Sequence, residues 1–160
     1  MSIWGALAGG FAGTLVLTTV LRAASEARLT RIDLPFLLGT AFTANRGRAK
    51  VVGYLAHFGF GFIFALVYYG LFTAIGRSGW ALGAIFGLVH GAFTTTALVN
   101  VLLPLVHPRM GTPFTAAGSS PLIEAPGFLM RNYGPSTPLV SLAAHVFYGT
   151  IVGGFVALAH

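Results

Sequence analysis

The chain has no cysteine, and only three of its 160 residues are Asp or Glu. The absence of cysteine excludes disulfides, thiolate metal sites and cysteine nucleophiles. The sequence also lacks the G-x-S-x-G, H-E-x-x-H and glycine-rich phosphate-loop motifs that accompany hydrolytic and nucleotide chemistry. We therefore expect a protein that is not an enzyme, with no catalytic residue and no metal site.

Charge of either sign is scarce. Charged residues make up 8% of the chain and hydrophobic residues 56%, whereas a soluble domain carries about 25% charged residues. Four segments contain no Asp, Glu, Lys or Arg, and each is long enough for a bilayer, which takes roughly 20 residues. They are residues 3–21, 51–75, 80–103 and 139–159. The sequence predicts an all-α polytopic membrane protein, with residues 1–160 forming one domain, a four-transmembrane-helix bundle.

The few cations are distributed unevenly between the connectors. Eight of the nine Lys and Arg residues lie in residues 22–50 and 104–137, and the ninth is Arg77 in the turn between the second and third segments. Positive charge collects on the cytoplasmic side of membrane proteins. We therefore expect cytoplasmic connectors, with both termini outside. The cations should face anionic lipid headgroups, and we expect no nucleic-acid partner.

The first connector contains one helix-start signal. Asp33 precedes Leu34 and Pro35, the order of a capping side chain followed by a proline in the first turn. We expect a short helix along the inner membrane interface, with a plain loop as the alternative.

Glycine recurs every fourth residue in two places, at Gly79, Gly83, Gly87 and Gly91, and again from Gly5 to Gly13. Such a ladder removes every Cβ from one helix face, so a second helix can approach closely in lipid. Further glycines lie one or two turns after histidines. The glycines expected at helix contacts are Gly5, Gly9, Gly13, Gly61, Gly79, Gly83, Gly87, Gly91, Gly149 and Gly153.

The pattern occurs twice along the chain. Tyr54-Leu-Ala-His57-Phe-Gly-Phe-Gly61 in the second segment matches Leu142-Ala-Ala-His145-Val-Phe-Tyr-Gly149 in the fourth, and the two glycine ladders match each other. We interpret residues 1–76 and 77–160 as two tandem helical hairpins. Because each unit has two spans, the copies share one orientation, and their pseudo-twofold axis runs along the membrane normal.

With these histidine motifs and glycine ladders, the chain resembles an uncharacterised family of small four-helix bacterial integral membrane proteins. The resemblance covers most of the chain and implies a multi-pass location in the bacterial inner (cytoplasmic) membrane, with the termini on the periplasmic side. It carries over no functional residue.

His57, His90 and His145 are the candidate binding residues, because intramembrane ionisable groups are candidates for function. The main alternative is that each ring donates to a carbonyl or to a Thr, Ser or Tyr hydroxyl across a helix contact and stabilises packing, and a second alternative is a proton relay. Each histidine shares a helical face with small residues, so the rings should point into the bundle. Counting from the helix ends places His57 and His145 roughly 10 Å inside the cytoplasmic boundary and His90 roughly 20 Å inside. The first two would therefore meet at one level without the third, which argues against a compact three-histidine metal site.

Three functions stay open. The preferred one is an accessory or scaffold subunit without a cofactor, packed in the lipid bilayer against other membrane protein subunits or as a homo-oligomer. A second is a small haem b or chlorophyll-type pigment protein ligated by His57 and His145, with His90 as a further candidate. A third is a channel or carrier for a small neutral solute along residues 94–96 and Asn100. For the threonines there, we also expect hydroxyl bonds to carbonyls four residues earlier.

Overall fold

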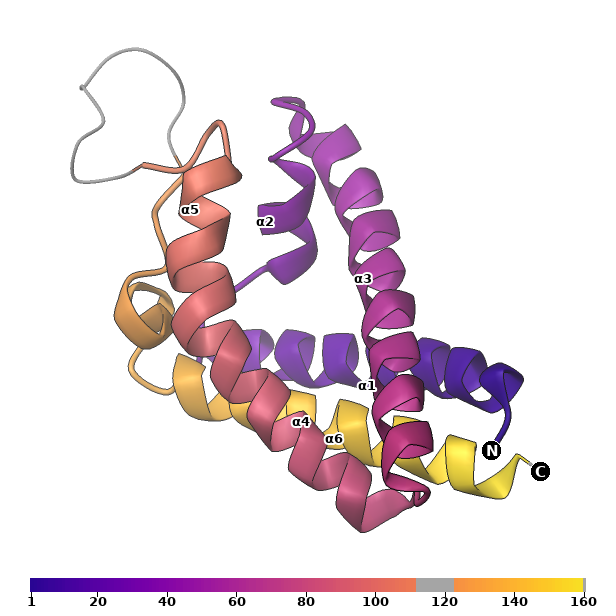
Figure 1. Ribbon diagram of the computed structural model, residues 1–160. Helices are drawn as coiled ribbons and strands as arrows, with labels where there is room; N and C mark the ends of the chain where they lie inside the picture. The colour runs from indigo at the N-terminus through magenta and orange to yellow at the C-terminus, as the bar shows by residue number, and fades with distance from the viewer. Residues whose placement is uncertain (112–122, 160) are drawn as a thin grey trace.

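The computed structural model describes residues 1–111 and 123–159, which form an all-α fold (Figure 1). Four helical stretches are long and apolar enough to cross a membrane: Ile3–Glu26, Arg46–Ile75, Trp80–Val106 and Thr137–Leu158. They confirm the four predicted spans. In chain order the elements are α1 (Ile3–Glu26), α2 (Leu34–Gly39), α3 (Arg46–Ile75), α4 (Trp80–Phe93), the π-helix η1 (Thr94–Leu102), α5 (Leu103–Val106), the 3₁₀ helix η2 (Phe128–Tyr133) and α6 (Thr137–Leu158).

The long helices are not equally packed. In Figure 1, α1 and α6 lie side by side in opposite directions, and the two chain ends lie near each other. Close backbone contacts join α1 to α6, α4 to α6 and α1 to α3. By contrast, α3 and α4 follow each other through a short turn and then diverge. The two contacts that a twofold axis would exchange, α1 with α6 and α4 with α3, therefore differ.

Glycines place α4 directly against α6. A Cβ built on Gly83 would overlap the carbonyl oxygen of Gly149, and one on Gly87 would overlap the carbonyl oxygen of His145. The two backbones thus touch, and no side chain fits between them. Gly91 and Gly153 are further predicted contact glycines on this seam, whereas a Cβ on Gly79 would meet nothing within 4 Å, and only the Gly79 carbonyl oxygen lies against Gly153.

The first glycine ladder holds α1 against both of its neighbours. Gly13 lies beneath the ring of Tyr148 on α6, while Thr14 fills the space that a side chain at Gly61 of α3 would occupy. Gly5 and Gly9 face α6 in the same way. The contact faces of these glycines are therefore covered by other helices of the same chain.

The predicted short helix is present as α2. The Asp33 carboxylate accepts a hydrogen bond from the backbone N–H of Phe36 at 3.0 Å, which confirms the cap. Its packing on α3 was not predicted: a Cβ on Gly53 of α3 would overlap the carbonyl oxygen of Pro35. The helix therefore packs tightly against α3.

Two side chains of the second connector hold the end of α2. The His107 Nε2 donates to the carbonyl of Leu37 at 3.1 Å, and the Arg109 guanidinium donates to the carbonyl of Thr40 at 2.8 Å. These are among the carbonyls that a helix C-terminus leaves without partners. The contact fixes α2 relative to the end of α5, across the region where α3 and α5 lie apart.

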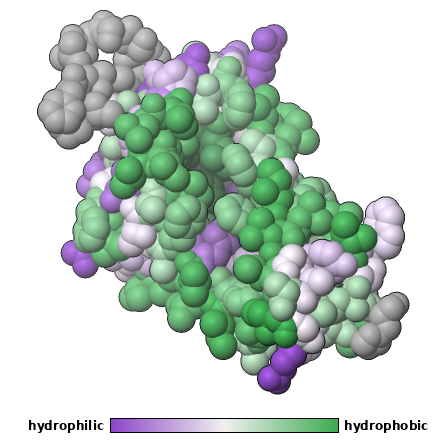
Figure 2. All heavy atoms as spheres, in the orientation of Figure 1, coloured by the Kyte–Doolittle hydropathy of each residue, from purple (hydrophilic) through white to green (hydrophobic). Residues whose placement is uncertain are grey.

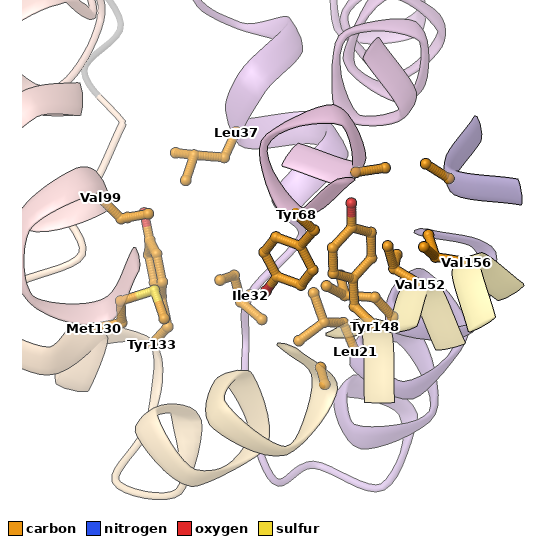
Figure 3. Close-up of a cluster of buried hydrophobic side chains, with 14 of the residues drawn as sticks. Leu21, Ile32, Leu37, Tyr68, Val99, Met130, Tyr133, Tyr148, Val152 and Val156 are labelled. Carbon is orange, nitrogen blue, oxygen red and sulfur yellow. The ribbon is translucent and has the colours of Figure 1, made fainter. Parts of the chain in front are cut away.

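The core gathers around two tyrosines. The rings of Tyr68 on α3 and Tyr148 on α6 meet edge to face, with centroids 5.7 Å apart (Figure 3). Val152 and Val156 extend this core along α6. On the outside, large apolar side chains such as Leu55 and Val89 are exposed. An apolar exterior of this kind suits a lipid bilayer.

Candidate functional site

A cavity of about 440 Å³ lies between α3 and the continuous helix α4–η1–α5. Phe60 and Phe64 of α3 line one side, Leu98 and Leu102 of η1 line the other, and Leu34 of α2 contributes from a third direction. Figure 2 shows a hollow on this face with apolar walls and a hydrophilic patch at its floor. The divergence of α3 from α4 leaves this space.

All three predicted histidines line this cavity. His57 comes from α3, His90 from α4 and His145 from α6. The rings of His90 and His145 meet nearly at right angles, with centroids 4.7 Å apart. The side chains of His57 and His145 are buried, and His90 is half-buried. The structure thus collects in one place three residues that are far apart in the sequence.

The expected separation in depth between His90 and His145 is wrong. Counting from helix ends assumed that the third and fourth spans finish at one level. Instead, Gly91 lies against Leu142, only five residues into α6, which begins at Thr137, while the third span continues for fifteen residues to Val106. The third span therefore projects well past the start of α6, and His90 lies beside His145.

The hydrogen bonds of two histidines define their chemistry. His145 Nδ1 lies 2.7 Å from the backbone carbonyl of Ser141, which can only accept, so Nδ1 carries the proton and Nε2 keeps its lone pair. His90 Nδ1 lies 3.3 Å from the Tyr68 hydroxyl. The Phe64 ring covers His90, with centroids 3.9 Å apart. The floor thus presents oriented imidazoles.

Two residues that line the cavity each carry a polar atom that is enclosed by protein and has no hydrogen-bond partner: Nε2 of His57 and the hydroxyl oxygen of Thr94. A buried polar group without a partner is costly and is unusual in a native structure. By contrast, Thr95 and Thr96 donate to the carbonyls of Gly91 and Ala92, four residues earlier, as expected. Of these three threonine hydroxyls, only that of Thr94 has no hydrogen-bond partner.

Thr94 is also the first residue of the π-helix, which the sequence did not predict. The third span runs as α-helix to Phe93, as π-helix to Leu102 and as a short α-helix beyond. The third segment was predicted to end at residue 103, but the helix continues through Pro104 to Val106. Local π-helical turns often occur at functional sites.

Two further cavity residues carry hydroxyls that sequence reasoning did not single out. Tyr148 donates to the carbonyl of Gly61 at 2.6 Å, and Thr14 donates to the carbonyl of Gly10 at 2.7 Å. Both hydroxyls are committed to backbone oxygens, so their role is to shape the floor. The sequence does offer a signal for Tyr148: it lies one helical turn after His145, so the two side chains share a helix face.

The geometry also bears on haem. The Nδ1 bond of His145 leaves Nε2 oriented as in many axial ligands. However, the His90 ring already packs against the His145 ring, so a macrocycle between His57 and His145 would have to displace it. Within residues 1–111 and 123–159, no three His, Cys, Asp or Glu side chains are grouped to hold a metal ion.

None of the described residues that line the cavity is Asp, Glu, Lys or Arg. The site therefore combines apolar walls with neutral hydrogen-bonding groups. Comparisons with protein-family models, curated proteins and solved structures found no match for this chain.

Proposed function

We propose that this chain is a non-enzymatic, multi-pass membrane protein that holds a lipophilic molecule in the cavity between α3 and η1. The observation that carries the proposal is the pairing of apolar walls with two unpartnered buried polar atoms, on His57 and Thr94. Small-molecule sites are typically concave and apolar, with a few polar groups that fix orientation. This cavity matches that description.

The chemistry of the floor favours binding over catalysis. A histidine acting as general acid or base works with a nucleophile or an orienting group within hydrogen-bond reach. Here His145 is oriented by its own helix, and His90 is paired with a tyrosine. The described lining offers no carboxylate to complete a hydrolytic arrangement.

The accessory-subunit hypothesis is a second candidate with narrower support. Most of the predicted contact glycines face other helices of this chain, so the ladders themselves do not call for an external partner. Gly59 and Gly70 of α3 differ, because a Cβ at either would meet nothing within 4 Å. A partner helix on that face of α3 would use them. Gentle purification would show such a subunit directly.

Photolabelling tests the binding proposal. An alkyl diazirine hydrocarbon would be added to the protein in lipid nanodiscs, and the labelled residues mapped by mass spectrometry. We expect saturable labels on cavity residues, suppressed by excess unlabelled hydrocarbon. Leu98→Trp fills the cavity and should reduce these labels several-fold. Val101→Trp, an exposed position of the same π-helix outside the cavity, should not.

Labelling that is spread evenly over the lipid-facing surface and is unchanged by Leu98→Trp would contradict the proposal. A Leu98→Trp variant with the wild-type melting temperature is required for this comparison, because an unfolded protein would also lose the labels.

A further inference from the structure

We propose that the molecule held in this cavity is a neutral amphiphile with a flat, oxygen-bearing ring as its head, the chemistry of a quinone or its quinol. The head lies on the histidine floor, and the apolar tail runs out between α2 and α5. This inference rests on the proposed binding function and names the ligand class for the same cavity.

The neutrality of the head follows from the lining. Within the described part of the chain, no Lys, Arg, Asp or Glu side chain reaches this cavity. A carboxylate, phosphate or ammonium head would lose its water without gaining an opposite charge, which is strongly unfavourable in apolar surroundings. A neutral head avoids that cost.

The need for an oxygen on the head follows from the unpartnered groups. The Thr94 hydroxyl has a proton and no acceptor, and Nε2 of His57 has no partner in either role. The Thr94 hydroxyl is enclosed by protein, and a rotation about its Cα–Cβ bond turns it toward the cavity, where a carbonyl or hydroxyl oxygen of the ligand accepts from it. The lone pair on His145 Nε2 accepts from a hydroxyl. A quinone oxygen can accept a hydrogen bond from the Thr94 hydroxyl. A quinol hydroxyl can accept that bond and also donate to His145 Nε2.

The flat shape follows from the rings around the floor. Phe60, Phe64, His90 and Tyr148 all line the cavity. The Phe64 ring stacks on the His90 ring, with centroids 3.9 Å apart and planes inclined by 34°, so a ligand ring meets an outer face of this stacked pair. Aromatic surfaces of this kind pack favourably against another planar ring.

The tail direction follows from the rest of the lining. Leu34 and Leu38 of α2 and Leu105 and Val106 of α5 line the cavity away from the histidines. Leu105 and Val106 are among the most exposed apolar side chains of the described chain. An alkyl or isoprenoid chain passing between these elements would cover them and continue into lipid.

Three probes with one decyl tail separate the head chemistries. Decyl-substituted para-benzoquinone, decylbenzene and para-decylbenzoate would each compete with the diazirine label in nanodiscs, with concentrations counted per lipid. We expect the quinone to compete about tenfold more strongly than decylbenzene, as one or two hydrogen bonds provide. The benzoate should be the weakest competitor.

Thr94→Val tests the contact with little change in shape. We expect this variant to lose about three- to tenfold of the preference for the quinone over decylbenzene. Competition by decylbenzene itself should be unchanged. Thr96→Val is the matched control, because that exposed hydroxyl bonds to Ala92 on its own helix. His57→Phe supplies a second variant on the opposite side of the cavity and should reduce the same preference.

The outcomes separate this inference from the function on which it rests. Equal, saturable competition by quinone and decylbenzene would overturn the head assignment while leaving cavity binding intact. Stronger competition by the benzoate would overturn the neutral head. The absence of competition by every probe would overturn both proposals. A quinone preference that survives Thr94→Val and His57→Phe would refute the assigned contacts.

Discussion

At the scale of single residues, the partners of its ring nitrogens decide what each histidine can do. His107 uses both: Nδ1 accepts from the Arg109 backbone N–H at 3.1 Å, and Nε2 donates to the Leu37 carbonyl. His145 uses Nδ1 on its own helix, while Nε2 of His57 has no partner. Both ring nitrogens of His107 therefore serve the fold, whereas Nε2 of His145 and Nε2 of His57 can each bond to a ligand. Residue type alone does not distinguish them.

Tyr133 provides a pH-dependent contact within the second connector. Its hydroxyl donates to the Glu124 carbonyl at 2.6 Å. Burial, reinforced by the negative charge of Glu124 and opposed by Arg31, raises the pKa of the phenol to about 12. In the unfolded chain the pKa lies near 10, so that state loses the proton first as the pH rises. The stability linked to this group is therefore complete below about pH 10 and is lost between about pH 10 and 12.

We expect Tyr133→Phe to reduce the loss of thermal stability between about pH 9 and 11. Melting temperatures of the purified protein in one detergent at the two pH values measure this loss. Tyr54→Phe, at an exposed position, controls for removal of a phenol as such. Equal losses in wild type and Tyr133→Phe would show that this tyrosine does not control the alkaline response.

At the scale of helices, backbone contact between α4 and α6 should make Gly83 intolerant of any side chain. A Cβ there overlaps the Gly149 carbonyl oxygen, and backbone cannot move aside as a flexible side chain would. We expect Gly83→Ala to destabilise the protein by about 1–3 kcal/mol, the usual cost of overpacking. Unfolding by sodium dodecyl sulfate from mild detergent micelles measures the change.

Gly70→Ala is the matched control for that substitution. Gly70 also lies inside a long helix, but a Cβ there meets nothing within 4 Å. We expect a gain of about 0.5–1 kcal/mol, because alanine favours the helix over glycine. If both variants lose stability equally, the cost reflects glycine replacement in general and not the contact between α4 and α6.

The helices themselves were the predictable part of this fold. The four spans, the Asp33 cap and the carbonyl bonds of Thr95 and Thr96 depend on local composition and spacing, which the sequence displays directly. Local composition and spacing do not determine the π-helix that begins at Thr94 or the contact between the His90 and His145 rings. They depend on how far one helix extends past another, and that offset is set by tertiary packing.

At the scale of the whole molecule, side-chain size distinguishes the helix pair α1–α6 from the helix pair α3–α4. Glycine lets α1 and α6 approach, whereas aromatic rings separate α3 from α4. Phe72 stacks on Phe86 with centroids 5.1 Å apart, and Tyr68 meets the same ring at 5.6 Å. Large aromatic rings therefore lie between these two helices. The cavity lies where α3 and α4 diverge, and the interpretation of the sequence as two tandem hairpins did not predict it.

The orientation of the whole molecule is the remaining prediction, and the absence of cysteine makes it directly testable. Single cysteines would be introduced as Ser78→Cys, in the turn before α4, and Ala44→Cys, in the exposed connector before α3. The cation distribution places the first position outside and the second in the cytoplasm. A membrane-impermeant maleimide should therefore label Ser78→Cys in intact bacterial cells, and Ala44→Cys only after permeabilisation. The reverse pattern would place the cationic connectors outside, and the positive charge would then have to serve a purpose other than topology.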